Sequence, residues 1–293
     1  MSEKWIDQSW KDVLAENLDD AISFFMPDLA SDRDYSEKIT MLDSALPVID
    51  SGTDKGKRDM DVCLKIPLSG GKSQCVTLCI EQQHKPDESF SLRVFQEYYR
   101  ALDKFRVPVT SLAIFTGNIK TVDIHSSSCY GSSLNFRYNA YHVLSADIEE
   151  LKQDKRVFAL VVLAARRMLD AGGNAGDPIK RGKYSLELLD LTRERGYDNE
   201  KTRSLLKFIV HILRVNDEKV DPKVRETWKM RWVPIDEVVR DIHIRDAREE
   251  GMEKGEERGK KEMARNLLSN GVPPDIIAKS SGLSMNDIQC LMN

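Results

Sequence analysis

The sequence predicts a mixed α/β fold, in which a sheet flanked by helices is followed by a helical region and a small helical tail. Within the first 145 residues of the 293-residue chain, hydrophobic patterns alternate between helix and strand periods. Beyond residue 145 the patterns are helical, and residues 240–265 interleave acids and bases with almost nothing apolar to bury. A chain of this length can form one substantial core and at least one smaller unit.

Hydrophobic periodicity assigns the elements of the first 145 residues. Apolar side chains recur at three- and four-residue steps in the helical segments, and β-branched and aromatic residues are frequent in the strands. In chain order, the predicted elements are a helix over 7–25, strands over 38–45, over 57–66 and up to Glu81, a helix over 90–105, and strands over 111–115 and 136–144. This order predicts a mixed sheet with helices packed against it.

Proline and glycine residues mark the boundaries of these elements. Pro27 follows the first helix and Pro108 the second, because proline is disfavoured inside a helix. Gly70 and Gly71 lie in the turn that leads into the third strand, and Gly117 follows the fourth.

The rest of the chain is predicted to be helical. Residues 146–239 form the predicted helical region, with helical periodicity over 148–170, 186–192 and 199–213. Residues 240–265 predict a solvated linker helix, in which charges are interleaved and glycine recurs at 251, 255 and 259. Residues 266–293 predict two or three short helices with a glycine-containing turn, compatible with a small helix-turn-helix unit.

The composition predicts a soluble cytoplasmic protein with reduced cysteines and no membrane contact. The longest apolar run, residues 157–165, is far shorter than the roughly 20 residues of a membrane-spanning helix, and residues 1–10 show no leader pattern. The five cysteines lack zinc-knuckle spacing, which fits thiols that fill core positions. With a formal net charge of -4, contact with nucleic acid requires a local basic surface.

Two acidic residues interrupt apolar strand segments. Asp61 lies in the second predicted strand, and Glu81 ends the third. A carboxylate near a sheet interior is costly unless it is paired, hydrogen-bonded or bound to a metal. Two acids on neighbouring strands can hold a divalent cation, although Asp61 at a strand start and Glu81 at a strand end are also compatible with solvated rim positions.

Several separate segments together resemble the recombination-promoting nuclease and putative transposase family of bacteria, within the PD-(D/E)XK nuclease superfamily. The segments that carry the resemblance are Asp7 to Lys11, Phe24 to Leu29, Arg58 to Lys65, Ile80 to Gln83, Phe90 to Arg93, Tyr98 to Arg100, Pro108 with Val109, and Glu249 to Ser284. Each motif alone is weak, but their order and spacing are fairly specific. The resemblance covers about residues 5–145 and 245–293 and implies a restriction-endonuclease-like core.

The resemblance implies a metal-dependent endonuclease that cleaves double-stranded DNA, linked to recombination or mobile DNA. Asp61, Glu81 and Gln83 would be the catalytic residues. Asp61 and Glu81, with the backbone carbonyl of Gln82, would bind Mg²⁺, and this hard-oxygen set also suits Mn²⁺ or Ca²⁺. Arg93 and Arg100 would contact phosphates. Homodimers are common among enzymes that cut both DNA strands, so a homodimer is compatible with this function.

The chain departs from the superfamily pattern at the lysine position, which holds Gln83. Glutamine, which is common there in this family, can orient water and bind a phosphate oxygen, yet it carries no charge. Lys85, Lys65 and Lys11 are the candidates for the missing cation. Cys79 also stands where the family usually has histidine, and Glu97 where it has an aromatic residue.

Two other functions fit the same sequence. One is a catalytically degenerate DNA-binding or regulatory protein of the same fold, which would bind DNA through the terminal helices. The tail is a poor base for this, because Lys279 is its main cation after Arg265. The other is an interaction protein that oligomerises through residues 240–265, although these lack the apolar seam of a coiled coil.

Overall fold

The computed structural model describes residues 3–42, 62–81, 89–117, 123–173, 176–231, 255, 258–270, 272–282 and 288. For residues 3–5, 7, 73–81 and 279 it describes the backbone alone. The chain divides into two compact units, residues 1–228 and 229–293. The first unit is mixed α/β, as the sequence predicts, and contains both described sheets.

The N-terminal segment forms three helices, α1 (Glu3–Glu16), α2 (Leu18–Phe25) and α3 (Pro27–Ser31), where one continuous helix was predicted over 7–25. The break lies at Asn17, whose φ of -137° is not helical. The Asn17 amide donates to the Val13 carbonyl at 3.0 Å and to Ser204 Oγ at 2.8 Å. A tertiary hydrogen bond therefore accompanies a break that local periodicity does not reveal.

In the described part of the chain, five strands form one mixed sheet in the order β1-β2-β3-β4-β7. The strands are β1 (Thr40–Leu42), β2 (Val62–Leu68), β3 (Lys72–Glu81), β4 (Val109–Phe115) and β7 (Asn139–His142). Pairing is antiparallel from β1 to β3 and parallel from β3 through β4 to β7. The predicted end of the third strand at Glu81 is confirmed.

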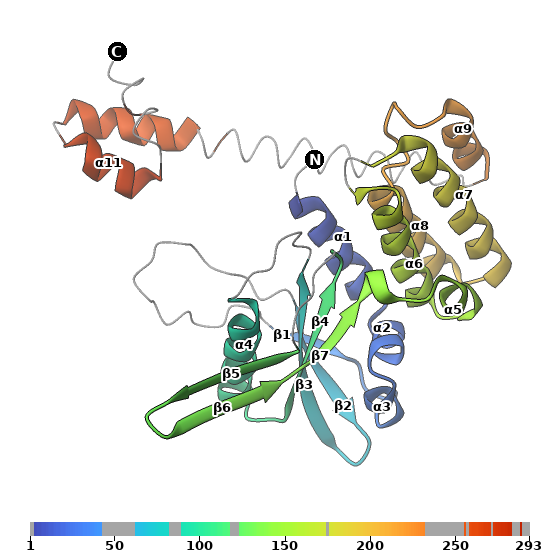
Figure 1. Cartoon of the computed structure of the whole chain (residues 1–293), viewed down its shortest axis with the longest axis horizontal. Coiled ribbons are helices and arrows are strands. Elements are labelled where there is room, and N and C mark those ends of the chain that lie inside the picture. Colours follow the sequence, from blue (N-terminus) through green and yellow to red (C-terminus); the bar gives the residue numbers. More distant parts are fainter. Residues whose placement is uncertain are drawn as a thin grey trace. The chain divides into compact units, whose positions relative to one another are not determined.

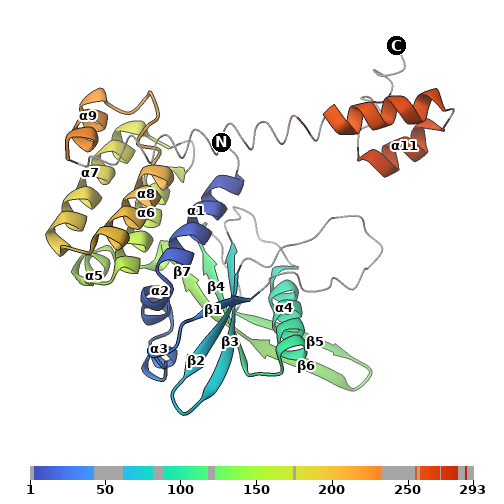
Figure 2. The same ribbon diagram turned by 180° about the vertical axis from the view of Figure 1, so that it is seen from behind.

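Helix α4 (Phe90–Phe105), at the predicted bounds, connects the parallel strands β3 and β4. A crossover of this kind is required because a tight turn cannot join parallel strands. Figures 1 and 2 show α4 on one face of the sheet and α1 to α3 on the other. Both faces of β4 are thus covered, which is why residues 111–115 are all buried.

The predicted strand over 136–144 is instead divided between two sheets. Strands β5 (Ile124–Cys129) and β6 (Ser132–Arg137) form a separate antiparallel hairpin that extends beyond the main sheet in Figure 1. Its turn places Tyr130 and Gly131 at φ of 45° and 86°, as a tight hairpin turn requires. Cys129 is exposed beside this turn, contrary to the expectation that cysteines fill the core, whereas Cys63 is buried.

The helical region contains a short 3₁₀ turn, η1 (Val143–Ser145), and helices α5 to α9. The helices are α5 (Ile148–Gln153), α6 (Val157–Asp170), α7 (Pro178–Arg195), α8 (Asn199–Ile212) and α9 (Pro222–Arg231). The apolar run 157–165 is buried throughout because α6 is the central helix of this part. The helix predicted over 148–170 is interrupted after Gln153, where Asp154 accepts hydrogen bonds from the backbone and side chain of Arg156.

The second unit contains a helix over residues 258–269 and helix α11 (Pro274–Ser281). Gly282 ends α11 in the left-handed conformation, with φ of 70°. Ala264, Ile277 and Ile288 form its small core. Most of the predicted linker, and much of the tail after Gly282, lies outside the described residues. No helix in the described part of the chain is long and apolar enough to cross a membrane.

An ion cluster joins α5, α6 and α7. Glu187 accepts two hydrogen bonds from Arg167, at 3.0 and 2.8 Å, and Lys152 Nζ lies 3.0 Å from its Oε1. Burial raises the pKa of Glu187, but Arg167 and Lys152 outweigh this effect and hold the pKa below its usual value. The ionised form of Glu187 is therefore favoured in the folded state.

Replacing Ile114 with alanine is expected to lower the free energy of unfolding by about 3 kcal/mol, because removal of this fully buried side chain leaves a cavity beside β4. Ile179→Ala is the matched control, since Ile179 is 80% exposed, and its effect should stay within about 0.5 kcal/mol. Urea unfolding measures both values. Equal losses for the two variants would contradict the burial of β4 between two layers.

Glu187→Gln is expected to destabilise the protein near neutral pH and to matter less as the solution becomes acidic. A lowered folded-state pKa stabilises the fold above the unfolded-state value of about 4.5, and this contribution disappears as pH falls through the folded-state pKa. Urea unfolding of both proteins between neutral and acidic pH measures the difference. Glu194→Gln, an exposed change on the same helix, is the control, and a constant Glu187 effect would refute the ion cluster.

Candidate functional site

The structure describes only part of the predicted metal site. Asp61, Gln82 and Gln83 lie outside the described residues, so the predicted approach of the two carboxylates stays a prediction. Glu81 is the last residue of β3, and its backbone is described. The site is therefore built from the surroundings of this strand end.

Glu81 belongs to a row of residues at one edge of the sheet. It lies opposite Phe115 on β4, and Phe115 lies opposite His142 on β7. Because the three strands are parallel, all three residues mark carboxyl ends, the edge where open α/β sheets bind ligands. Adjacent strands are roughly 4.8 Å apart, so about 10 Å separates the backbones of Glu81 and His142.

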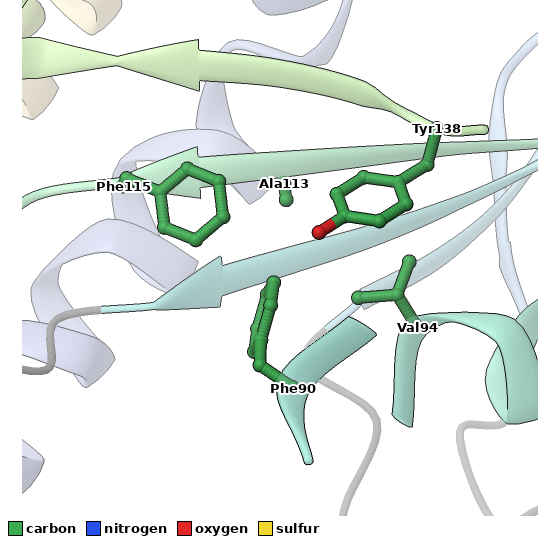
Figure 3. Close-up of a cluster of buried hydrophobic side chains, with 5 residues drawn as sticks. All are labelled: Phe90, Val94, Ala113, Phe115 and Tyr138. Carbon is green, nitrogen blue, oxygen red and sulfur yellow. The ribbon is translucent and has the colours of Figure 1, made fainter. Parts of the chain in front are cut away.

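A buried cluster holds Phe115, the β4 residue of this row, on the face of the sheet that α4 covers. Phe115 and Ala113 of β4 pack with Phe90 and Val94 of α4, and Tyr138 completes the cluster. Figure 3 shows the α4 side chains pointing toward those of β4 and Tyr138. The Phe90 and Phe115 rings meet edge to face, with centroids 5.2 Å apart. The start of α4 is thereby held against the carboxyl end of β4.

His142 lies beside the same cluster. Its ring stacks on Phe115 with centroids 4.7 Å apart and planes inclined by 17°. Tyr141, the preceding residue, faces the opposite side of the sheet, where it contacts Phe24 and Phe25 of α2. Strand alternation therefore places the imidazole of His142 on the α4 face.

The two predicted DNA-binding arginines lie at different distances from this edge. Arg93 and Arg100 are seven residues apart on α4 and share one side of the helix, and both are partly exposed. The Arg93 guanidinium lies 5.3 Å from the centre of the Phe90 ring, near the carboxyl end of β4. Arg100 lies about 10 Å further along the helix. Of the two, Arg93 is the one close to the strand-end row.

Lys65 is not positioned to replace the missing motif lysine. It lies on β2 opposite Cys75, which precedes Glu81 by six residues along β3. Six residues of strand span about 20 Å, which is beyond the reach of a lysine side chain. Lys11 is partly buried on α1, and Lys85 lies outside the described residues.

A polar pocket at the root of the hairpin was missed by the sequence analysis. It has a volume of about 540 Å³ and is lined by Asp123, Arg137, Tyr138, Asn139, Ala140 and His142. Arg137 Nη1 donates to Asp123 Oδ2 at 3.1 Å. No specific signal in the sequence indicated His142, because it lies inside the strand predicted over 136–144, whereas the observed β7 ends at this residue. The alignment of His142 with Glu81 depends on strand pairing.

A second histidine lies on the same side of the hairpin. His125 Nδ1 is 3.3 Å from Ser91 Oγ of α4, and its ring stacks on Phe95 with centroids 5.8 Å apart. Phe95 and Tyr98 also contact Phe136 of β6. These contacts attach the root of the hairpin to α4.

Within the described residues, no group of three or more His, Cys, Asp or Glu side chains is placed to hold a metal ion. Two of the three predicted ligands are outside those residues. The donor set itself, two carboxylates and a carbonyl, consists of the hard oxygen atoms that Mg²⁺ prefers.

Comparisons with protein-family models, with curated proteins and with solved structures gave no match for this chain.

Proposed function

We propose that this chain is a metal-dependent DNA endonuclease of the PD-(D/E)XK type, related to the recombination-promoting nucleases. The observation that carries the proposal is the register of β2, β3 and β4. Glu81 ends the strand that pairs with both of the others, and Asp61 is bonded to Val62, the first residue of β2. The start of β2 and the end of β3 lie at the same edge of the sheet, and Asp61 directly precedes β2 in the sequence.

The alternation of the strands supports a shared face for the two acids. Cys63 lies opposite Thr77, and Glu81 is four positions after Thr77 on β3, so Thr77 and Glu81 share a face of the strand. Cys63 packs against Phe105 of α4, so these positions belong to the α4 face. If the alternation of β2 continues to Asp61, both acids occupy that face, as one shared cation requires.

The chemistry follows from the residues in this arrangement. A bound Mg²⁺ would supply charge stabilisation for phosphodiester hydrolysis and a water of lowered pKa. Asp61, Glu81 and the Gln82 carbonyl would hold the ion. The Gln83 amide would orient water or bind a phosphate oxygen, and Arg93 would contact a backbone phosphate beside the strand ends.

A catalytically degenerate DNA-binding protein is the second candidate. It is favoured by the uncharged Gln83 at the lysine position and by the distance of about 20 Å along β3 that separates Lys65 from Glu81. Such a protein would bind double-stranded DNA on the same surface without cutting it. Metal-dependent cleavage separates the two functions.

Glu81→Gln is expected to weaken Mn²⁺ binding at least about ten-fold, because the variant loses one of two anionic ligands. Isothermal titration calorimetry of the full-length protein measures the affinity. Lys65→Gln, a change at an exposed side chain of β2, should bind Mn²⁺ as the wild type does. Unchanged binding in Glu81→Gln would remove Glu81 from the metal site.

Asp61→Asn and Glu81→Gln are each expected to reduce Mg²⁺-dependent nicking of supercoiled plasmid by about a hundred-fold or more, since both remove transition-state charge stabilisation. Lys65→Gln should cut at the wild-type rate. Urea unfolding shows whether the variants remain folded. Folded variants that still cut would refute the assignment, and a wild type that binds duplex without cutting would favour the degenerate protein.

A further inference from the structure

The pocket at the root of the β5–β6 hairpin, which lies next to the strand-end row, has the size and chemistry of a ligand subsite. Its volume of about 540 Å³ falls within the usual range for small-ligand pockets. Its lining includes Arg137, which carries a guanidinium group, and His142, which carries an imidazole. These groups can donate hydrogen bonds to an anionic oxygen.

The register connects this pocket to Glu81. His142 lines the pocket and lies opposite Phe115, which in turn lies opposite Glu81. The backbone separation of about 10 Å is only a few times the axial rise of a duplex, which is roughly 3.4 Å per nucleotide. A DNA strand with its scissile phosphate at Glu81 would therefore extend to the pocket.

The charges around the hairpin favour a phosphate. Arg137 uses one of its nitrogens for Asp123, and this ion pair is exposed, with side-chain exposures of 68% and 42%. Exposed pairs of this kind contribute little, so a phosphate can compete with the carboxylate for the guanidinium. Residues 124–138 contain no Asp or Glu, although the chain has 48 such residues. The hairpin therefore carries no acid that would repel a DNA backbone.

We propose that this pocket is a phosphate subsite for the DNA strand that passes Glu81, with Arg137 as its cation and His142 as a second donor. The proposal rests on the proposed function, because it needs a DNA strand at the carboxyl ends of the parallel strands. Stacking on Phe115 holds the His142 ring in place for this contact. Both residues are positioning residues for substrate and take no part in bond cleavage.

The test is duplex affinity of the full-length protein, measured by fluorescence anisotropy of a short labelled duplex in EDTA. Arg137→Gln is expected to weaken binding about three- to ten-fold and to reduce the slope of log affinity against log salt by about 1. Asp123→Asn should tighten binding, because it releases the guanidinium. His142→Phe keeps the ring stack but removes the donor and should weaken binding about two-fold.

A second exposed ion pair supplies the matched control. Arg106 and Asp103 lie 3.0 Å apart at the end of α4, with side-chain exposures of 80% and 59%, near the amino end of β4. Arg106→Gln and Asp103→Asn should leave duplex affinity and its salt slope unchanged. The comparison separates a local contact from a general change in net charge.

The outcomes of the two proposals are distinguishable. Arg137-dependent duplex binding without metal-dependent cutting would refute the endonuclease and retain the subsite. Wild-type affinity in Arg137→Gln would overturn the subsite, whether or not the protein cuts DNA. Undetectable duplex binding by the wild type, or tighter binding of a labelled nucleoside monophosphate than of duplex, would also overturn it.

Discussion

The parallel pairing of β3, β4 and β7 is the constraint on which the rest of the first unit depends. Both faces of β4 are covered, so its backbone N–H and C=O groups must form hydrogen bonds with neighbouring strands. Strand β4 therefore requires a paired strand on each side. Parallel neighbours bring the carboxyl ends of several strands to one edge. This places Glu81, Phe115 and His142 in one row, although they are far apart along the chain.

The packing of α4 determines what surrounds that row. Its first turn is held by Phe90 against Phe115, and its Phe95 and Tyr98 contact the hairpin. One helix therefore connects the strand ends, the Arg93 guanidinium and the root of the β5–β6 hairpin. The polar pocket lies at the root of the hairpin, and its lining residue His142 stacks on Phe115 of the buried apolar cluster. Electrostatic contacts with a charged ligand are stronger next to such an apolar wall.

The helical region supports the sheet through both apolar and polar contacts. Phe25 of α2 contacts Phe158 of α6 as well as Tyr141 of β7, so the α2 layer is shared between the sheet and the helices. The Phe158 backbone N–H donates to Asp20 of α2. Residues 1–228 consequently form one compact unit. A substitution in the helices can thus affect the sheet without any contact with the strand-end row.

The sequence by itself determined the mixed α/β class, the bounds of α4, the end of β3 and the choice of Glu81 as a residue of interest. Periodicity and proline positions are local, so they specify these features. Tertiary structure decided the break at Asn17, the division of residues 136–144 between β6 and β7, and the alignment of His142 with Glu81. These depend on a hydrogen bond to Ser204 and on strand register, which bring together groups that are distant in the chain and leave no periodic signal in the sequence.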